Sequence, residues 1–483
     1  MIMEPLGYIV VLLGIFGVAY GTRLAIWTLC LSTLFGAAAA LQLPWLGGAS
    51  IQPGHLMLVF FIASVLLRPV QTQAALVSIA YPGPGFWFAA YVLFSVASAF
   101  FLPRIFAGAT LVYSSARDAL GTMSTVASPL SPGSSNVTQA IYLLSDLACF
   151  AAAAGLTRLG YAPVIARSLV ATTIACLVLA ILDIATYLTG HSQLLDFIRN
   201  ANYTMHTAET IAGFKRIVGS FPEASTYAGT ALVLFSFTFM LWLERFPSRL
   251  AGLAAAFIGV TILISTSTTA YIGGLFVVCI LVLFSVRRLL GGRAGPPHAS
   301  FLIVTLFIVP CGIVTLMQMP DVWNSITALL DATFTNKLDS QSGEERTAWN
   351  TLALISFVDT STFGAGLGTV RASSFIAALL SNVGLCGTLL FGAFLYNLLT
   401  AARLHSSGNG QDRAIGMAAV FASVAQIAVA MISGSGTDLG LLFSILAGLA
   451  TGCLAAPQAL PRYASGSPTS ARPREASPML VVR

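Results

Sequence analysis

Residues 269–288 read TAYIGGLFVVCILVLFSVRR, an apolar run that two arginines close. As an α-helix, which rises about 1.5 Å per residue, such a run can cross the roughly 30 Å hydrocarbon core of a bilayer. A segment in lipid must satisfy its backbone hydrogen bonds internally, and a helix does so. Arginines at the end of such a run are typical of the cytoplasmic edge of a membrane. We therefore predict a transmembrane helix over 269–286.

Comparable apolar runs recur along the chain. Of its 483 residues, 57% are hydrophobic and 8% are charged, whereas about a quarter are charged in soluble domains. The mean hydropathy is +0.87. These values predict an all-α polytopic membrane protein with about 12 to 14 transmembrane helices in residues 1–456. Besides 269–286, the runs fall at roughly 6–20, 25–43, 55–68, 86–102, 138–157, 168–189, 224–243, 249–265, 300–318, 376–402, 414–433 and 439–456.

The arginines predict an orientation. They gather in short connections on one side, which the positive-inside rule assigns to the cytoplasm; the side includes Arg245, Arg249, Arg287, Arg288, Arg293, Arg403 and Arg413. Alternation of the helices then places three longer segments outside, at 103–137, 190–223 and 319–375. The tail 457–483 is rich in Pro, Ser and Arg, so we expect it to be disordered and cytoplasmic. The net charge of +6 is ordinary for such a protein, and no nucleic-acid partner is predicted.

The segment before 224–243 carries two cations and a helix start. Lys215 and Arg216 precede Pro222 and Glu223, and Ser225 follows. Proline favours a helix start, where free N–H groups attract anions. We therefore predict an anion-binding corner here; the alternative is that these cations meet lipid head groups.

The large outer loop 319–375 contains a second cationic pattern. From Ser342 onward the sequence predicts a short helix, with Ser342 as its cap and Glu345 as the partner in a capping box. Helical spacing puts Arg346, Trp349, Asn350 and Ala353 on one face. That face would present a guanidinium beside an aromatic ring and an amide.

A glycine run follows that predicted helix. Gly364, Gly366 and Gly368 would let the backbone approach a bulky ligand closely, and Arg371 comes next. The alternative for the whole loop is a flexible connector with incidental arginines.

Other polar residues are weaker site candidates. Asp146 and Asp183 lie in predicted spans, where a carboxylate is expensive; we favour a protonated or Arg-paired structural role for each. His191 and His206 lie outside, without a second His or Cys at metal spacing, so we predict no metal site.

Two stretches together resemble a known family. Arg216-Ile-Val-Gly-Ser-Phe-Pro-Glu-Ala-Ser precedes one span, and Arg346-Thr-Ala-Trp is followed by Phe363-Gly-Ala-Gly-Leu-Gly and Ser381-Asn-Val-Gly-Leu-Cys-Gly387. Over roughly 200–405 the chain resembles the bacterial O-antigen ligase and O-antigen or exopolysaccharide polymerase superfamily. The resemblance implies a GT-C-like fold in the bacterial inner membrane, with the outer loops in the periplasm.

The resemblance also implies an activity. It is that of a glycosyltransferase using sugar units on undecaprenyl diphosphate, without metal or nucleotide cofactor, and Arg216 and Arg346 match the arginines that hold the diphosphate. The ligase branch has a histidine where this chain has Ser373, so the polymerase branch is preferred. A ligase is the alternative within the family, and a transporter or flippase for lipid-linked glycan is the alternative from another class. Membrane lipids, a chain-length regulator and a flippase are the candidate partners.

The chemistry of that reaction suits the same residues. Displacing a diphosphate from a sugar carbon builds negative charge on the leaving group, which fixed guanidiniums stabilise. We assign diphosphate binding to Arg216, Arg346, Lys215 and Arg371, and a substrate loop to Trp349, Asn350, Gly366 and Gly368. Glu223 is the favoured base because it lies near Arg216 in the sequence; the other candidate bases are Glu344, Glu345, Asp359 and His206.

Overall fold

The computed structural model describes residues 2–43, 49–117, 123–203, 205–211, 213–320, 323–324, 327–328, 341–404 and 410–454. Helices make up most of this structure. They are α1 (Pro5–Tyr20), α2 (Thr22–Ser32), α3 (Pro53–Leu66), α4 (Pro69–Ser78), α5 (Pro84–Ile105), α6 (Ser134–Leu156), α7 (Ala162–Leu188), α8 (Ala224–Leu243), α9 (Arg249–Ile264), α10 (Thr268–Leu290), α11 (Pro296–Ile303), α12 (Val309–Met317), α14 (Gln341–Asp359), α15 (Phe375–Leu404), α16 (Gly410–Ser433) and α17 (Gly440–Leu454). Short π- or 3-10 helical turns lie at Thr157–Tyr161, Ser192–Ile198 and Val304–Ile308.

The helices form a membrane bundle. Among the described residues, seven helical stretches are long and apolar enough to cross a bilayer, or eight if α3 and α4, which meet at a bend of 110°, count as one broken span. The predicted multi-pass membrane fold is confirmed. The predicted number of 12 to 14 is larger because it also counted the shorter apolar helices α1, α9 and α17. The stretch Ser134–Leu188 enters the seven as one, but Gly160, with φ 87° and ψ 14°, breaks it between α6 and α7, so the prediction of two helices there is confirmed.

One predicted span is wrong. Instead of a helix over 25–43, α2 ends at Ser32, and residues 41–43 form strand β2. The apolar run between them misled the prediction because its residues are buried in protein: Ala37, Ala38, Ala39 and Ala40 have no exposed surface. Burial inside a protein and burial in lipid select the same apolar residues.

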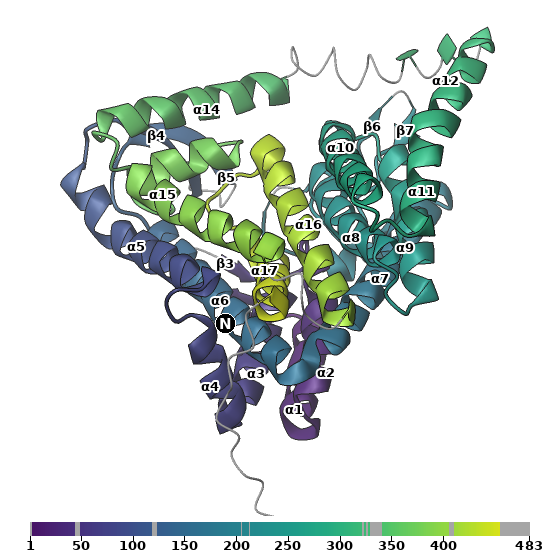
Figure 1. The fold of residues 1–483 in the computed structure, drawn as a ribbon. Coiled ribbons are helices and arrows are strands. Elements are labelled where there is room, and N and C mark those ends of the chain that lie inside the picture. Colours follow the sequence, from purple (N-terminus) through teal and green to yellow (C-terminus); the bar gives the residue numbers. More distant parts are fainter. Residues whose placement is uncertain are drawn as a thin grey trace, which may run out of the picture.

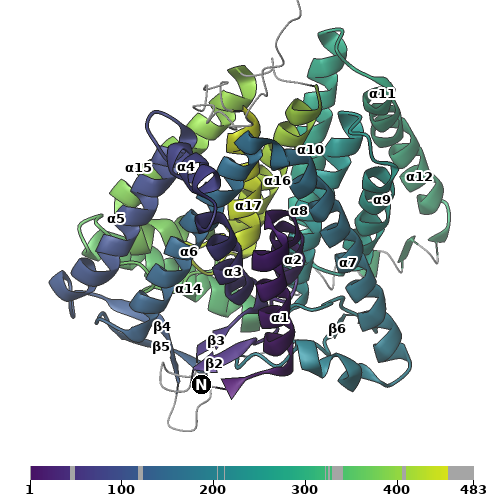
Figure 2. The ribbon, with the colours of Figure 1, turned by 90° about the horizontal axis from the view of Figure 1, so that it is seen from below.

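Three small antiparallel sheets accompany the helices, and the sequence analysis did not predict them. They are β1 (Ile2–Met3), β2 (Leu41–Leu43) and β3 (Ala49–Ile51); β4 (Leu111–Arg117) with β5 (Met123–Pro129); and β6 (Thr210–Ile211) with β7 (Phe214–Lys215). Figure 2 shows these strands gathered at one end of the bundle, which we call the strand end. The strand end brings together parts of all three longer segments that the sequence places outside. Which side of a membrane it faces stays a prediction.

Helix α14 supplies part of the loop 319–375. The predicted short helix is confirmed and extends over Gln341–Asp359. It packs on α15 and β4, and Figure 1 shows α5, α14 and α15 on one side of the central helices α6, α16 and α17, with α7 to α12 on the other. Ala353 is fully buried, while Arg346, Trp349 and Asn350 are half-buried. The predicted shared face is therefore confirmed. The side chain of Ser342, the predicted cap, and the tail 457–483 lie outside the described residues.

Helix α15 is broken near its start. Gly384 has φ 63° and ψ −165°, which are not helical angles. A Cβ on Gly384 would lie 2.3 Å from the carbonyl oxygen of Phe363. The break thus lets the connection after α14 pass directly against α15.

Helices α6 and α17 form the closest pair at the centre of the bundle. A Cβ on Gly448 would lie 2.6 Å from the carbonyl oxygen of Phe150, and one on Gly452 would lie 2.4 Å from Cβ of Thr157. The two glycines are four residues apart, a spacing that lets membrane helices pack backbone to backbone. Close packing here depends on the missing side chains.

We expect Gly448→Val to destabilise the protein by about 1–3 kcal/mol, because the new side chain must displace the backbone of α6. Thermal unfolding of the purified chain in detergent measures the effect. Gly274→Val in α10 is the matched control, since a Cβ there has no neighbour within 4 Å. Equal unfolding temperatures for the two variants would contradict this account of the packing.

Candidate functional site

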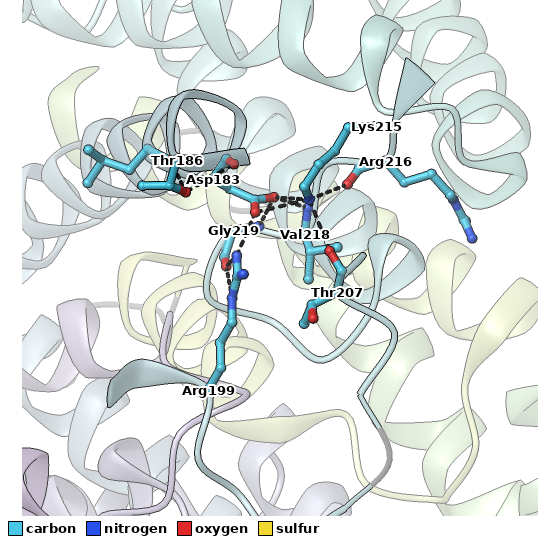
Figure 3. A network of polar contacts seen from close by, with 9 residues as sticks. Asp183, Thr186, Arg199, Thr207, Lys215, Arg216, Val218 and Gly219 are labelled. Atoms are coloured by element: carbon cyan, nitrogen blue, oxygen red, sulfur yellow. Dashed lines mark hydrogen bonds and ion pairs between the residues drawn. The ribbon is translucent and has the colours of Figure 1, made fainter. Parts of the chain in front are cut away.

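Asp183, near the end of α7, is the centre of a buried ion network at the strand end (Figure 3). Its Oδ1 accepts a hydrogen bond of 2.7 Å from Nη2 of Arg199 and lies 3.1 Å from Nζ of Lys215. The three side chains are only 2%, 6% and 7% exposed, in the order Asp183, Arg199, Lys215. Pairing removes most of the cost of burying these charges. The predicted Arg-paired structural role of Asp183 is confirmed.

The same carboxylate holds the chain that leads into α8. Oδ2 of Asp183 accepts hydrogen bonds from the backbone N–H groups of Val218, at 2.8 Å, and Gly219, at 3.1 Å. Nε of Arg199 donates to the carbonyl of Gly219 at 2.9 Å. Asp183 therefore fixes the backbone immediately after Arg216.

Lys215 is occupied by the protein's own chain. Besides Asp183, its Nζ donates to the carbonyls of Thr207, at 3.0 Å, and Arg216, at 3.1 Å. It also lies 5.4 Å from the centre of the Tyr187 ring. An ammonium has three donors, and these contacts use them. In this arrangement Lys215 holds β7 in place. Its ammonium group has no N–H left to donate to a diphosphate, which is the contact that the sequence predicts.

Arg216 points away from Asp183 (Figure 3). Its guanidinium pairs with Glu209, which also accepts from Nδ1 of His206 at 2.9 Å. The side chain of Arg216 is 13% exposed. Its Nε is buried without a hydrogen-bond partner in the described part of the chain. Buried donors in proteins are seldom left unsatisfied, so Arg216 retains a donor for a further ligand.

Glu223 is the residue that caps the start of α8, and its side chain is half-buried. The hydroxyl of Ser225 donates to its carboxylate, and that of Thr226 does so at 3.5 Å. The carboxylate of Glu223 makes no capping hydrogen bond to the free N–H groups of α8, so the predicted anion-binding corner stays a prediction. Glu223 is positioned as an acceptor of protons or hydrogen bonds.

The other half of the site centres on Arg371. Its guanidinium carbon lies 4.4 Å from the centre of the Trp349 ring, a cation–π contact. Burial lowers the pKa of Arg371, the nearby charges of Glu223 and Glu345 raise it, and that of Arg346 lowers it. Trp349 of α14 thus contacts the guanidinium of Arg371, and the charges of Glu223, Glu345 and Arg346 act on it.

A cavity of about 280 Å³ lies beside Arg371. It is lined by Ser135, Gln139, Gly368, Thr369, Val370, Arg371, Asn382, Ser435, Gly436 and Thr437. The backbone N–H of Arg371 donates to the carbonyl of Tyr113 at 2.9 Å, which ties the residue to β4. Asn350 helps to hold this wall, because its Oδ1 accepts from the N–H of Ser373 at 2.8 Å.

The glycine run has a packing function. Gly364, Gly366 and Gly368 have φ of +86°, +98° and +79°, a region that side chains rarely tolerate. A Cβ on Gly366 would lie 2.5 Å from Cδ of Pro103, and one on Gly368 would lie 2.8 Å from the carbonyl of Ser135. Gly366 and Gly368 thus allow a close approach to α5 and α6, while Gly364 packs against α15. Gly368 also lines the cavity beside Arg371, and a substrate contact of Gly366 and Gly368 stays a prediction.

Two buried asparagines hold the loop in place, and the sequence analysis did not select them as site residues. Oδ1 of Asn382 accepts from the N–H groups of Thr369 and Val370, both at 3.0 Å. Nδ2 of Asn136 donates to the carbonyl of Leu367 at 2.7 Å and to Oγ1 of Thr369 at 2.8 Å. The sequence feature that could have identified them is an amide side chain inside or beside an apolar run, where an unpaired polar group is costly.

The other candidate bases lie apart from this cluster. Glu344 and Asp359 are on the exposed face of α14, and His206 is bound to Glu209. Within the described ranges, no three His, Cys, Asp or Glu residues form a group that could hold a metal ion.

Comparison with known proteins gives no matching family model and no matching curated protein. The family resemblance therefore rests on the motifs themselves. The function has to be argued from the geometry around Arg371 and Arg216.

We expect Asp183→Asn to destabilise the protein by about 3–5 kcal/mol, because it leaves the cations of Arg199 and Lys215 buried without a counter-charge. Thermal unfolding in detergent measures the loss, and faster trypsin cleavage between residues 199 and 216 would locate it. Asp196→Asn, in the exposed turn before Arg199, should unfold like the wild type. An Asp183 variant as stable as this control would refute the role of the network.

We expect Asn382→Leu to destabilise the loop beside Arg371. The substitution leaves the backbone N–H groups of Thr369 and Val370 without an acceptor, at a cost of about 1–3 kcal/mol each. Hydrogen exchange followed by mass spectrometry should show faster exchange in residues 366–373. Asn397→Leu is the control, because Asn397 donates only within its own helix, to Ala393. Unchanged exchange in the Asn382 variant would show that other contacts hold the loop.

Proposed function

We propose that this protein is a membrane-embedded glycosyltransferase that polymerises oligosaccharide units carried on a polyprenyl diphosphate, of the undecaprenyl type. The reaction takes place at the strand end, and the strand end faces the periplasm of a bacterial inner membrane. Arg245 follows α8, Arg249 begins α9, and Arg287 and Arg288 lie in the last turn of α10, all at the opposite end, for which the positive-inside rule favours the cytoplasm.

The observation that carries the proposal is the position of Arg371, whose guanidinium lies on the Trp349 ring at 4.4 Å and which lines a cavity of about 280 Å³. The charges of Glu223, Glu345 and Arg346 act on Arg371, and we call these four residues the charge cluster around Arg371. The positive charge of Arg346 disfavours the charged form of Arg371. A diphosphate ligand would offset that effect, since guanidiniums bind phosphate oxygens in bidentate fashion.

In the proposed reaction, a hydroxyl oxygen of the acceptor sugar bonds to the anomeric carbon of the donor. The bond from that carbon to the diphosphate oxygen breaks, and the electron pair leaves with the diphosphate. Arg371 and Arg346 stabilise the charge that develops there. Glu223, whose charge acts on Arg371, takes the proton of the hydroxyl.

Arg216 remains part of the proposed site and Lys215 does not. The buried Nε of Arg216 has no partner in the described structure, so the side chain can still receive a phosphate oxygen. Lys215 is saturated by Asp183 and two carbonyls. Its role in the proposal is to hold the backbone that carries Arg216.

A transporter is a weaker reading of the same structure. Intramembrane carboxylates are expected to mark a transport path. Asp183 is locked between Arg199 and Lys215, and the buried Asp146 of α6, which has no cation partner in the described residues, is the one feature that favours transport. A ligase transfers a completed glycan. At the position where the ligase branch has a histidine, this chain has Ser373, whose N–H donates to Asn350.

We expect Arg371→Ala and Arg346→Ala each to slow polymerisation by roughly 100- to 1000-fold, because each removes a contact that is stronger in the transition state. The measurement is the length distribution of surface glycan in the native host, with protein amount in the membrane checked. Arg371→Lys should recover only part of the activity, since an ammonium lacks the bidentate fork.

Arg104→Ala is the matched control. Arg104 lies in the last turn of α5 beside the strand end, is exposed and donates to Phe100 of its own helix. Single capped units with loss of long chains in the Arg346 and Arg371 variants would support polymerisation. Loss of all surface glycan would indicate ligation or transport, and wild-type lengths in both would refute the assignment of the site.

A further inference from the structure

A second cavity, of about 150 Å³, opens between the strand-end parts of five helices. It lies where α2 ends and where α3, α8 and α17 begin, beside α16. Its lining residues are Ser32, Thr33, Phe35, Gln52, Gly54, His55, Thr230, Gln426, Leu439, Gly440, Leu441 and Leu442. None of them belongs to the charge cluster around Arg371.

The cavity presents polar atoms that the protein leaves unused. Both ring nitrogens of His55 and Oε1 of Gln426 are buried without a hydrogen-bond partner in the described structure. The amide of Gln426 is held in place, because its Nε2 donates to the carbonyl of Leu439 at 3.2 Å. Unsatisfied buried polar groups are rare in native proteins. Their grouping in one cavity therefore indicates a ligand that supplies both donors and acceptors.

The charge around the cavity selects against anions. The described residues that line it include no arginine or lysine. The nearby charge that acts on His55 is the negative one of Asp438. A diphosphate would be repelled here, whereas hydroxyl groups can bond to an amide, an imidazole and the hydroxyl of Thr230.

The size suits one six-membered ring. A protein cavity of about 150 Å³ holds a benzene molecule, and a pyranose ring is of the same order. Two of its lining residues, Phe35 and His55, carry aromatic rings, and the His55 ring is supported by Tyr142, with 4.5 Å between ring centres. Apolar walls with a few fixed polar groups are the usual form of a small-molecule site.

The cavity lies next to the one beside Arg371. Residues 435–437 of the connection between α16 and α17 line the Arg371 cavity, and residues 439–442 line the second one. The connection is anchored by the hydroxyl of Tyr91, which donates to the carbonyl of Thr437 at 3.0 Å. A short piece of chain thus separates a cationic cavity from a neutral polar one.

We propose that the second cavity is a subsite for a neutral sugar ring, the terminal residue of the acceptor glycan. The identification of the ligand as the acceptor glycan rests on the proposed function. The ligand class, a neutral polyhydroxyl ring, follows from the lining alone. Arg371 holds the anionic part of the donor on one side of the α16–α17 connection, and Gln426, Thr230 and His55 hold the uncharged acceptor on the other.

The test measures binding of two probes to the purified full-length chain in nanodiscs. One probe is the neutral repeat oligosaccharide released from the host's surface glycan by mild acid, and the other is inorganic pyrophosphate. Gln426→Met and Thr230→Val, which keep side-chain volume, should each weaken oligosaccharide binding about tenfold and leave pyrophosphate binding unchanged. Arg371→Ala should weaken pyrophosphate binding and leave oligosaccharide binding unchanged. Thermal unfolding checks that each variant is folded.

The outcomes separate the two proposals. Oligosaccharide binding that is absent from the wild type, or equal in the wild type and both cavity variants, overturns the subsite and means that the cavity holds water only. Selective weakening in Gln426→Met and Thr230→Val supports it. If that selective weakening occurs while Arg346→Ala and Arg371→Ala leave glycan length unchanged, the sugar subsite stands and the proposed polymerase function fails.

Discussion

The strand end depends on one buried carboxylate. Asp183 neutralises Arg199 and Lys215 and accepts from the backbone of Val218 and Gly219, so a single side chain ties α7 to the chain that enters α8. Because the partners are buried, the attraction is little screened by water or salt. The direction of Arg216 follows from this, since its neighbours on both sides are fixed.

The second half of the site is held by a different kind of contact. Around Arg371 the backbone is fixed by neutral amides, those of Asn136, Asn382 and Asn350, and by glycines whose missing side chains admit α5 and α6. Because these supporting side chains are uncharged, they do not alter the charge around Arg371. The positive charge of Arg371 is therefore favoured by Glu223 and Glu345 and opposed by Arg346, while its supports carry no charge. A rigid, pre-positioned cation is what stabilisation of a leaving diphosphate requires.

Much of the fold could be predicted from particular segments. The run 269–286 is α10 with its ends moved by a few residues, and helical spacing on Arg346, Trp349 and Asn350 correctly placed them on one face of α14. The prediction failed at 25–43, where Ala37 to Ala40 are apolar because they are buried in protein. It did not foresee that Lys215, predicted to bind diphosphate, pairs with Asp183, 32 residues earlier in the chain.

The amino-acid sequence by itself determined that the chain is a helical membrane protein and which side chains are able to bind an anion, because hydropathy and residue chemistry are local properties. Only the tertiary structure decided which cations are used up and which remain. Lys215 pairs with Asp183 on α7, the Nε of Arg216 has no partner in the described residues, and Arg371 packs on Trp349 of α14. The physical reason is that pairing and burial depend on distances between residues far apart in sequence, and no periodicity along the chain encodes them.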